Sequence, residues 1–308
     1  MKSFKIDMDI NTAIMNIQSI LKGSVSNVQP INFGELSKVF SFCFQDKEYV
    51  IHFNNNGNRF NKDEYLYKKL SQLDIPIPKI ERNGKIDDIY FSISEKATGL
   101  SLEAYPENEI KNVLPALATE FKKIVQIPID STEKYGAIDY KGEGSFNSWQ
   151  QYIESFFQKE QDGFWKDWYT LFDHSFLEKE VFDYYYEMMM ELSLYSPEER
   201  YLVHGDFHLG NIISDGQDIT AIIDWELAMY GDFMFDIANI HFWAPQLEIP
   251  QIFHEAWIKN GEEIPHFQER LLCGMLFKGI DGLRFFAKKE DKAAYEMIKD
   301  KLSTIKKK

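Results

Sequence analysis

Three oxygen-bearing side chains lie at close intervals in the second half of the chain, and their types could do chemistry together. Asp206 follows an apolar run that ends in His204-Gly205, and Asn211 comes five residues after it. Asp224 ends the next apolar run, Thr220–Ile223. A carboxylate in a polar turn can accept the proton of an attacking hydroxyl, whereas a carboxylate and an amide oxygen are hard ligands that suit magnesium. The pattern predicts two short strands with polar residues gathered at one end.

A base and two metal ligands are what phosphoryl transfer requires, because that reaction depends on positioning and on charge stabilisation. The interval between Asp206 and Asn211 is also that of the protein-kinase catalytic loop, and Asp224 stands where a second metal-binding Asp follows. The competing interpretation is that Asp206 and Asn211 close a turn and that Asp224 caps a helix. Since both intervals, the apolar flanks and His204 occur together, phosphoryl transfer is the preferred interpretation.

Two longer motifs resemble the signature of the aminoglycoside phosphotransferase family. They are His204-Gly-Asp-Phe-His-Leu-Gly-Asn211 and Ile222-Ile-Asp-Trp-Glu-Leu-Ala-Met-Tyr-Gly-Asp232. The similarity is greatest toward the hygromycin-phosphorylating members and extends along nearly the whole chain, as at Phe40-Ser-Phe, Ile75-Pro-Ile-Pro78 and Ala238-Asn-Ile-His-Phe-Trp-Ala-Pro245.

This resemblance implies an α+β, protein-kinase-like fold with two lobes. Residues 1–95 would form a small N-lobe built on an antiparallel sheet, where the nucleotide binds. Residues 96–308 would form a larger, mainly helical C-lobe with the catalytic and acceptor sites. The resemblance also implies ATP or GTP as the phosphoryl donor and Mg²⁺ as the metal cofactor.

The same resemblance implies roles for three residues of the motifs. Asp206 would be the catalytic base and contact the acceptor hydroxyl, while Asn211 and Asp224 would hold the metal. From their positions next to this stretch, His204 and Asp236 are expected to brace the catalytic loop through hydrogen bonds.

Upstream of the motifs, the hydrophobic pattern predicts a sheet with two helices. Helical spacing occurs over Asp9–Leu21 and Phe60–Leu73. In one strand-like run Phe40, Phe42 and Phe44 share one face, as in a half-buried antiparallel strand. The predicted strands are Val28–Phe33, Val39–Phe44, Tyr49–Phe53 and Ile89–Ile93.

Two loops next to these strands are candidates for nucleotide contacts. The turn Phe33–Lys38 could fold over a triphosphate with Ser37 near the phosphates, or it could be a plain hairpin loop. The segment Ser94–Gly99 is expected to be the hinge between the lobes. There the backbone from Glu95 to Ala97 would meet the purine edge, as in kinase-like folds.

The lysine–glutamate pair that holds the phosphates in protein kinases is only half present. Glu64 is the candidate for the helix glutamate, but His52 stands where the strand lysine is expected. Four explanations remain open: His52 binds phosphate weakly, Lys62 or Lys38 substitutes for the lysine, the nucleotide binds in a different position, or His52 is a strand histidine with an unrelated partner.

From Tyr105 onward the spacing is helical. A helix over Glu107–Val125 is predicted to kink or restart at Pro115, and the stretch Trp149–Tyr186 is rich in aromatic residues. Most of these rings are expected to be core, although ring faces also suit sugars and cations. The resemblance associates Trp243 with the acceptor pocket. The last predicted helices are Gln251–Asn260, His266–Ala287 and Lys292–Lys301.

The composition is that of a globular protein, with 308 residues of which 44% are hydrophobic and 27% charged. The net charge of -15 argues against nucleic acid as a partner and would attract a polycation, although an acidic surface also serves solubility. No apolar run predicts a membrane span or a signal peptide, and Cys43 and Cys273 are too few for a disulfide framework. A cytoplasmic monomer with reduced thiols is therefore expected.

These patterns predict an ATP-dependent O-phosphotransferase that phosphorylates a hydroxyl of a cationic aminoglycoside, hygromycin B foremost, and so gives antibiotic resistance. A second hypothesis keeps the chemistry but takes another small hydroxyl: a different aminoglycoside, a macrolide, a sugar or an amino alcohol. A third is a nucleotide-binding pseudoenzyme, which His52 makes conceivable. The intact set of Asp206, Asn211 and Asp224 argues against the third hypothesis.

Overall fold

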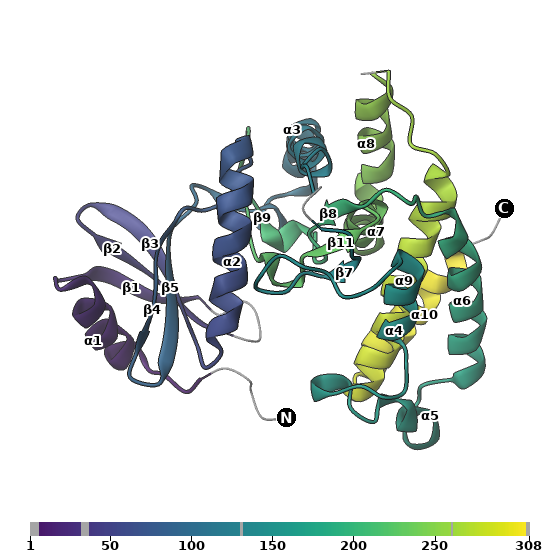
Figure 1. The fold of residues 1–308 in the computed structure, drawn as a ribbon, viewed down its shortest axis with the longest axis horizontal. Coiled ribbons are helices and arrows are strands. Elements are labelled where there is room, and N and C mark those ends of the chain that lie inside the picture. Colours follow the sequence, from purple (N-terminus) through teal and green to yellow (C-terminus); the bar gives the residue numbers. More distant parts are fainter. Residues whose placement is uncertain (1–5, 32–36, 130–131, 260, 306–308) are drawn as a thin grey trace. The chain divides into compact units, whose positions relative to one another are not determined.

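The computed structural model describes residues 6–31, 37–129, 132–259 and 261–305, and the chain divides into two compact units (Figure 1). The first unit comprises Met1–Tyr105, Asp139–Gly142 and Gly210–Glu226; the second comprises Pro106–Ile138, Glu143–Leu209 and Leu227–Lys308. Of the motif residues, Asn211 and Asp224 therefore belong to the first unit and Asp206 to the second. The lobe boundary between residues 95 and 96 stays a prediction.

A five-stranded antiparallel sheet forms the centre of the first unit, in the order β1-β2-β3-β5-β4. All four strands predicted from the sequence are present, and β4 is an additional edge strand. Its polar sequence, Glu81-Arg-Asn-Gly-Lys85, carries no apolar alternation that would have revealed it. The strands are β1 (Ser26–Ile31), β2 (Lys38–Phe44), β3 (Lys47–Asn54), β4 (Ile80–Ile86) and β5 (Ile89–Glu95).

The two faces of this sheet differ because side chains alternate along each strand. One face packs against helix α1 (Ile10–Leu21), which begins where the Asp9 carboxylate accepts a hydrogen bond from the Thr12 N–H at 2.8 Å. This face is apolar and fully buried: Phe40, Phe42, Ile51, Phe53, Phe91 and Ile93. The residues between them, including His52, Ser92 and Ser94, point to the opposite face.

The first unit is completed by one helix and one small sheet. Helix α2 (Gly57–Leu70) begins at Asn56, whose side chain accepts from the Asn58 N–H, and it buries Leu66 and Leu70. The small sheet has the order β10-β9-β6. Its strands are β6 (Leu100–Ser101), β9 (Ile212–Ser214) and β10 (Ile219–Ile222).

The second unit is mainly helical, as expected, and also contains a three-stranded sheet in the order β7-β11-β8. Helix α3 runs without interruption through Pro115, so a restart at this residue is wrong, whereas the kink stays a prediction. The strands are β7 (Gly136–Ala137), β8 (Tyr201–Val203) and β11 (Met229–Gly231). The helices are α3 (Glu107–Val125), α4 (Trp149–Phe156), α5 (Leu171–His174), α6 (Lys179–Leu192), α7 (Met234–Trp243), α8 (Ile249–Ile258), α9 (Phe267–Lys288) and α10 (Lys292–Thr304).

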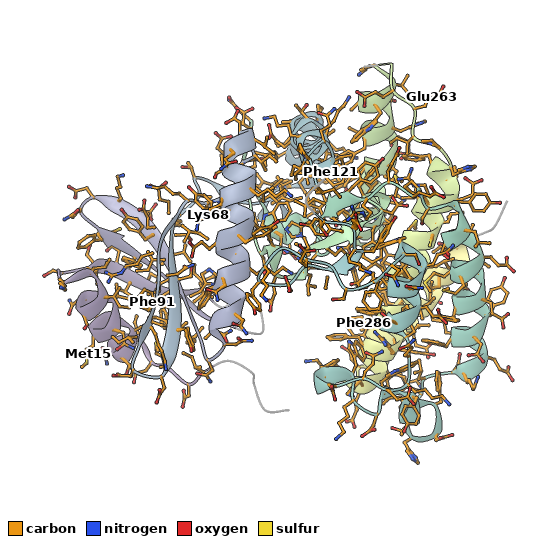
Figure 2. All side chains as sticks on the ribbon, in the orientation of Figure 1. Met15, Lys68, Phe91, Phe121, Glu263 and Phe286 are labelled. Atoms are coloured by element: carbon orange, nitrogen blue, oxygen red, sulfur yellow. The ribbon has the colours of Figure 1, made fainter. Side chains whose placement is uncertain are left out.

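Side chains fill the space between the helices of this second unit (Figure 2), and many of those in its core are aromatic. Trp149, Phe157, Trp168 and Phe182 are all at least nine-tenths buried, which confirms that most rings of the aromatic stretch are core. Phe157 meets Phe277 of α9 edge to face at 5.1 Å, so this stretch ties α4 to α9. No helix in the described part of the chain is long and apolar enough to cross a membrane.

Candidate functional site

A cavity of about 480 Å³ lies on the face of the five-stranded sheet that does not contact α1. All the residues that line it belong to the first unit. The strands contribute Val39, Val50, His52, Ser92 and Ser94, which are the alternate residues to the apolar core positions. The cavity therefore arises from the two-residue period of the strands, which sends apolar side chains to one face and smaller or polar ones to the other.

Most of the predicted nucleotide contacts line this cavity: Ser37, His52, Glu95 and Ala97. Ser37 is buried, and its Oγ accepts a hydrogen bond from Asn54 Nδ2 at 3.1 Å. Residues 32–36 of the predicted phosphate-covering turn lie outside the described residues.

The segment predicted to be the hinge, Ser94–Gly99, lies within the first unit, and two of its N–H groups form backbone hydrogen bonds. The Glu95 N–H donates to the Lys79 carbonyl at 2.9 Å, and the Lys96 N–H donates to the Glu48 carbonyl at 3.0 Å. Of these backbone groups, the N–H groups of Glu95 and Lys96 are therefore already used within the protein.

Glu64 does not line the cavity, in contrast to its neighbour Asp63. Its carboxylate instead accepts from Lys68 Nζ at 2.6 Å and from Asn83 Nδ2 at 3.2 Å. Successive side chains of an α-helix point about 100° apart, which is why Asp63 faces the cavity and Glu64 does not. Lys62, one of the proposed substitutes for the missing lysine, is buried, and its Nζ donates to the Glu226 carbonyl at 2.5 Å.

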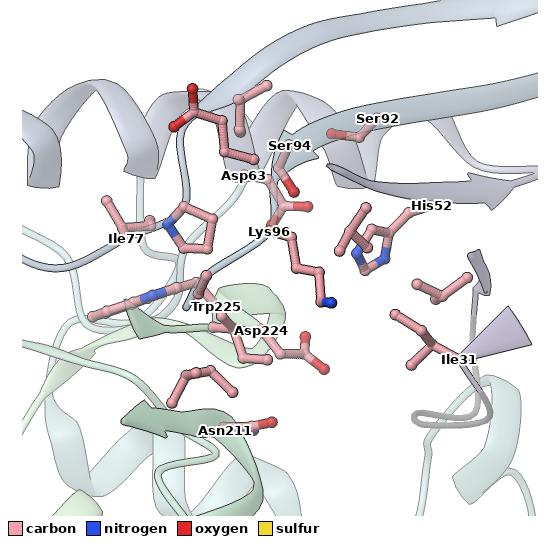
Figure 3. A pocket seen from close by; sticks show the side chains of 18 of the residues that line it. Ile31, His52, Asp63, Ile77, Ser92, Ser94, Lys96, Asn211, Asp224 and Trp225 are labelled. Carbon is pink, nitrogen blue, oxygen red and sulfur yellow. The ribbon is translucent and has the colours of Figure 1, made fainter. Parts of the chain in front are cut away.

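Asn211 and Asp224 are brought together by the β9–β10 hairpin. Asn211 immediately precedes β9, Asp224 follows β10 by one intervening residue, and the Ile223 N–H donates to the Asn211 carbonyl at 2.9 Å. Both residues line the cavity, and Figure 3 shows their side chains next to each other at one side of it. The pattern of two short strands with polar residues at one end is therefore observed for this hairpin.

The backbone at Asp224 has φ 61°, a left-handed conformation that residues other than glycine adopt rarely. Aspartate tolerates it better than most residues because its short polar side chain can form local hydrogen bonds. Conformations of this kind tend to be retained where a side chain must point in a particular direction.

Asp206 lies on the turn that follows β8, in the second unit. His208 Nε2 is 3.5 Å from its Oδ2, and the side chain of Asp206 is 37% exposed. Burial acts to raise the pKa of Asp206, but the interaction with His208 and the positive charge of Lys278 outweigh it and lower the pKa to about 2. The carboxylate is thus ionised at neutral pH and reaches solvent.

The turn before Asp206 is braced at its backbone. Asp236 on α7 accepts the His204 N–H at 2.7 Å with Oδ2 and the Gly205 N–H at 2.9 Å with Oδ1. His204 is fully buried, and its Nδ1 accepts the Asp206 N–H at 3.2 Å. Gly205 has φ +83°, and a Cβ there would lie 2.2 Å from the Leu227 carbonyl oxygen, so only glycine fits.

Asp236 is completely buried and sits one helical turn before a second bracing residue, Asn239. Burial raises the pKa of Asp236 to about 7, against the two backbone hydrogen bonds, which act to lower it. Asn239 Nδ2 donates to the Phe207 carbonyl at 3.2 Å. Sequence reasoning did not single out Asn239, although its position three residues after Asp236 places it on the same helix face.

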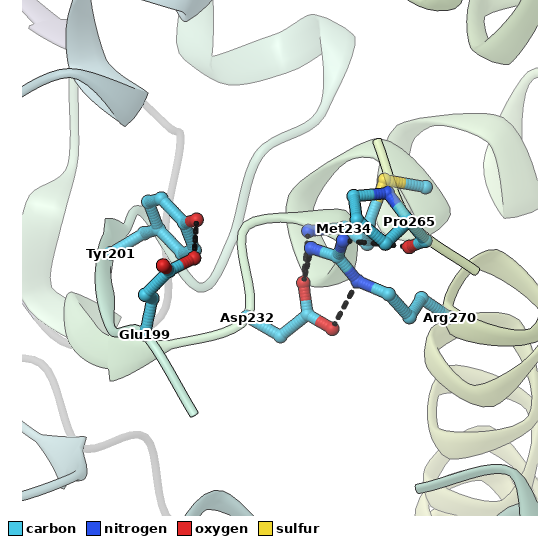
Figure 4. Close-up of polar contacts among 6 residues, drawn as sticks. All are labelled: Glu199, Tyr201, Asp232, Met234, Pro265 and Arg270. Atoms are coloured by element: carbon cyan, nitrogen blue, oxygen red, sulfur yellow. Dashed lines mark hydrogen bonds and ion pairs between the residues drawn. The ribbon is translucent and has the colours of Figure 1, made fainter. Parts of the chain in front are cut away.

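The start of α7 is held by a buried ion pair that sequence reasoning also missed. Arg270 on α9 donates to Asp232 through Nε at 2.9 Å and through Nη2 at 2.6 Å (Figure 4). Asp232 also accepts the Met234 N–H at 3.0 Å, in the first turn of α7. This bidentate geometry fixes α9 to the N-terminal end of α7, the helix that carries Asp236.

Trp243, the predicted acceptor contact, lies at the end of α7 and is 42% exposed. Its ring meets Phe242 edge to face at 5.4 Å, and Lys301 Nζ is 5.1 Å from its centroid. The ring therefore already interacts with one cation on the protein itself.

Comparisons with known proteins agree with this architecture. The sequence profile of the phosphotransferase enzyme family matches residues 28–266. Over 264 residues the chain is 32% identical to hygromycin-B 4-O-kinase of Escherichia coli, a match that spans 84% of this chain and 74% of that protein.

Solved structures are similar over nearly the whole chain. A thermostable mutant of aminoglycoside phosphotransferase APH(4)-Ia, in a ternary complex with AMP-PNP and hygromycin B, matches with a TM-score of 0.80 and 27% identity over 95% of this chain and 97% of that chain. Choline kinase from Streptococcus pneumoniae shares the fold, with a TM-score of 0.62 and 16% identity over 96% of this chain and 99% of that chain. The expected kinase-like fold is confirmed.

Proposed function

The chain belongs to the phosphotransferase enzyme family and is an aminoglycoside O-phosphotransferase, and from this premise we propose that it transfers the terminal phosphoryl group of ATP to a hydroxyl of hygromycin B. The observation that carries the chemistry is an ionised carboxylate, Asp206, on a turn whose backbone is braced by Asp236 and His204. The acceptor is inferred from the relatives named hygromycin-B 4-O-kinase and APH(4)-Ia.

In this proposal Asp206 accepts the proton of the acceptor hydroxyl as that oxygen attacks the terminal phosphorus. A carboxylate with a pKa of about 2 is a weak base, which suits a loose transition state in which the hydroxyl loses its proton late. The main contribution of Asp206 is then to orient the hydroxyl, and His208 beside it limits the rotation of the carboxylate.

Asn211 and Asp224 are proposed to hold Mg²⁺. The donor set fits this ion: an amide oxygen and a carboxylate oxygen, both hard ligands, face the same cavity from the two ends of one hairpin. Few protein ligands are needed, since magnesium keeps several waters and shares phosphate oxygens. When bound, the ion would offset the charge that develops on the phosphate oxygens.

The nucleotide is proposed to occupy the cavity on the first unit. The backbone near Glu95 and Ala97 would read the purine, and Ser37 and His52 would face the phosphates. His52 places an imidazole where protein kinases have the permanently charged ammonium group of a lysine. This chain is thus expected to rely on the metal, more than a lysine-containing relative would, to neutralise the triphosphate.

The acceptor is proposed to be a cationic aminoglycoside, for which a chain with a net charge of -15 provides a favourable field. Trp243 would contact its sugar rings through the exposed part of the indole. A phosphate group on such a drug offsets part of its positive charge. The modified drug is attracted less strongly to RNA phosphates, and this loss would confer resistance.

The experiment that tests this proposal is steady-state turnover of ATP and GTP with a panel of acceptors, in magnesium and after chelation. The panel contains hygromycin B, a different aminoglycoside, a macrolide and an amino alcohol, with product mass as the readout. Magnesium-dependent addition of one phosphate to hygromycin B is expected, with a kcat/KM at least about tenfold above that of the other acceptors. A different preferred acceptor would refute the assignment of hygromycin B as the substrate. Nucleotide binding without turnover of any acceptor would refute the proposed phosphotransferase activity.

A further inference from the structure

Lys278 of α9 reaches the catalytic turn, although it lies 72 residues after Asp206 in the sequence. Its Nζ donates to the Gly205 carbonyl at 3.2 Å and lies 5.2 Å from the centroid of the Phe235 ring. Gly205 is also the residue whose N–H is held by Asp236. The peptide groups on the two sides of Gly205 are thereby held from two different helices, α7 and α9.

The approach of α9 to α7 depends on a glycine one turn before Lys278. A Cβ added at Gly274 would lie 2.6 Å from the Ala238 Cβ and 3.4 Å from the Phe235 Cα. Even an alanine at this position would force the two helices apart. Gly274 therefore lets α9 pass close enough to α7 for a lysine at the next turn to reach the Gly205 carbonyl.

The ammonium group of Lys278 also lies in the field of two carboxylates. Its charge acts on both Asp206 and Asp236, and the charge of Asp206 in turn acts on Asp236. Two carboxylates that interact in a largely buried place repel each other, and a cation between neighbouring helices offsets part of that repulsion.

We propose that Lys278 is a positioning residue for phosphoryl transfer: it holds the Gly205 carbonyl and offsets the negative charge around the catalytic turn, so that the Asp206 carboxylate keeps its orientation. This role rests on the proposed function of Asp206 as the base. The lysine acts through the turn rather than on the nucleotide, whose proposed cavity is lined by residues of the first unit alone.

The test compares Lys278→Met and Lys278→Arg with Lys292→Met, which removes an exposed lysine from the start of α10. Lys278→Met should lower kcat by about 10- to 100-fold and leave the KM for ATP within about twofold, because misplacing the base affects the transition state and not nucleotide binding. Lys278→Arg should recover kcat to within about fivefold of wild type, since arginine can donate to the same carbonyl. Lys292→Met should change neither constant.

A second readout needs neither nucleotide nor acceptor. Amide hydrogen exchange at His204 and Gly205 should be faster in Lys278→Met than in wild type and slow again in Lys278→Arg, while strands β1 to β5 keep their protection. Unchanged exchange and kcat in Lys278→Met would overturn the proposal, as would a Lys278→Arg variant as inactive as Lys278→Met. If Lys278→Met does not fold, Lys278→Gln carries the same expectations.

The two readouts separate the failure of this inference from the failure of the proposed function. If wild-type protein phosphorylates no acceptor, the proposed function fails, and exchange at His204 and Gly205 still decides whether Lys278 positions the turn. If wild type is active and Lys278→Met is equally active, only the role of Lys278 fails.

Discussion

The buried ion pair between Arg270 and Asp232 gives the most quantitative prediction, because both partners are almost inaccessible to water. The side chain of Arg270 is 2% exposed and that of Asp232 is 6% exposed. Replacing Arg270 by Met leaves the Asp232 carboxylate buried without its cation, which typically costs about 3–5 kcal/mol. The loss should lie in the upper half of this range, since Arg270 also donates to the Pro265 carbonyl at 3.1 Å and stacks on Phe233.

A double-mutant cycle separates the pair from these additional contacts. Asp232→Asn alone leaves the Arg270 guanidinium buried without its anionic partner. This change should also lower the free energy of unfolding by about 3 kcal/mol, although the Asn oxygen can still accept the Met234 N–H. The double variant Asp232→Asn/Arg270→Met contains no buried charge at this position. Its cost should therefore be less than the sum of the two single costs by about 2–3 kcal/mol.

The assay is urea denaturation followed by tryptophan fluorescence and by far-ultraviolet circular dichroism at pH 7. Coincidence of the two transitions is required, because a chain with two compact units need not unfold in one step. Single costs that add to within about 0.5 kcal/mol of the double cost would refute the reasoning. So would an Arg270→Met variant as stable as wild type.

Three further predictions concern Gly205, His52 and Asp206. Gly205→Ala should lower kcat at least about tenfold, because φ is +83° and the Cβ would meet the Leu227 carbonyl oxygen at 2.2 Å; wild-type kcat in this variant would show that the turn tolerates a side chain. His52→Lys should lower the KM for ATP, since lysine supplies a full positive charge where the structure has an imidazole. Titration with a fluorescent nucleotide checks this directly, and an affinity equal to that of wild type would show that His52 does not face the phosphates. Asp206→Asn should remove a pH dependence of stability: because the pKa of Asp206 falls from 3.8 to about 2 on folding, its carboxylate stabilises the fold above pH 3.8, and this contribution is lost as the pH falls toward 2. With a side chain that is 37% exposed the whole contribution is about 1 kcal/mol, and about half of it is lost between pH 5 and pH 3, because pH 3 still lies above the pKa of the folded state. Wild type should therefore lose about 0.5 kcal/mol relative to the variant over this interval, and a stability difference between the two proteins that does not change with pH would contradict the prediction.

The sequence was most informative where a local period decides the structure. Alternation in Val39–Phe44 predicted the buried face with Phe40 and Phe42. His52 of the neighbouring strand pairs with Val39, so its side chain points to the other face of the sheet. The two apolar runs between Asn211 and Asp224 predicted the hairpin that brings these two residues to one side of the cavity.

Features that depend on distant contacts could not be predicted. Arg270 and Lys278 lie on α9, and nothing in their local sequence shows that one pairs with Asp232 and the other reaches Gly205. β4 was missed because an edge strand needs no apolar alternation. The kinase pattern suggested Glu64 as the helix glutamate, but the sequence does not show which side chains of α2 line the cavity, where the structure has Asp63.

The measurement that tests the central claim most directly is phosphorylation of hygromycin B by wild-type protein and by Asp206→Asn under saturating magnesium and ATP, followed by product mass. The account predicts one added phosphate with wild type and a kcat lowered by about 100- to 10,000-fold in the variant, with little change in the KM for ATP. An Asp206→Asn variant that phosphorylates hygromycin B at the wild-type rate would contradict the assignment of Asp206 as the base.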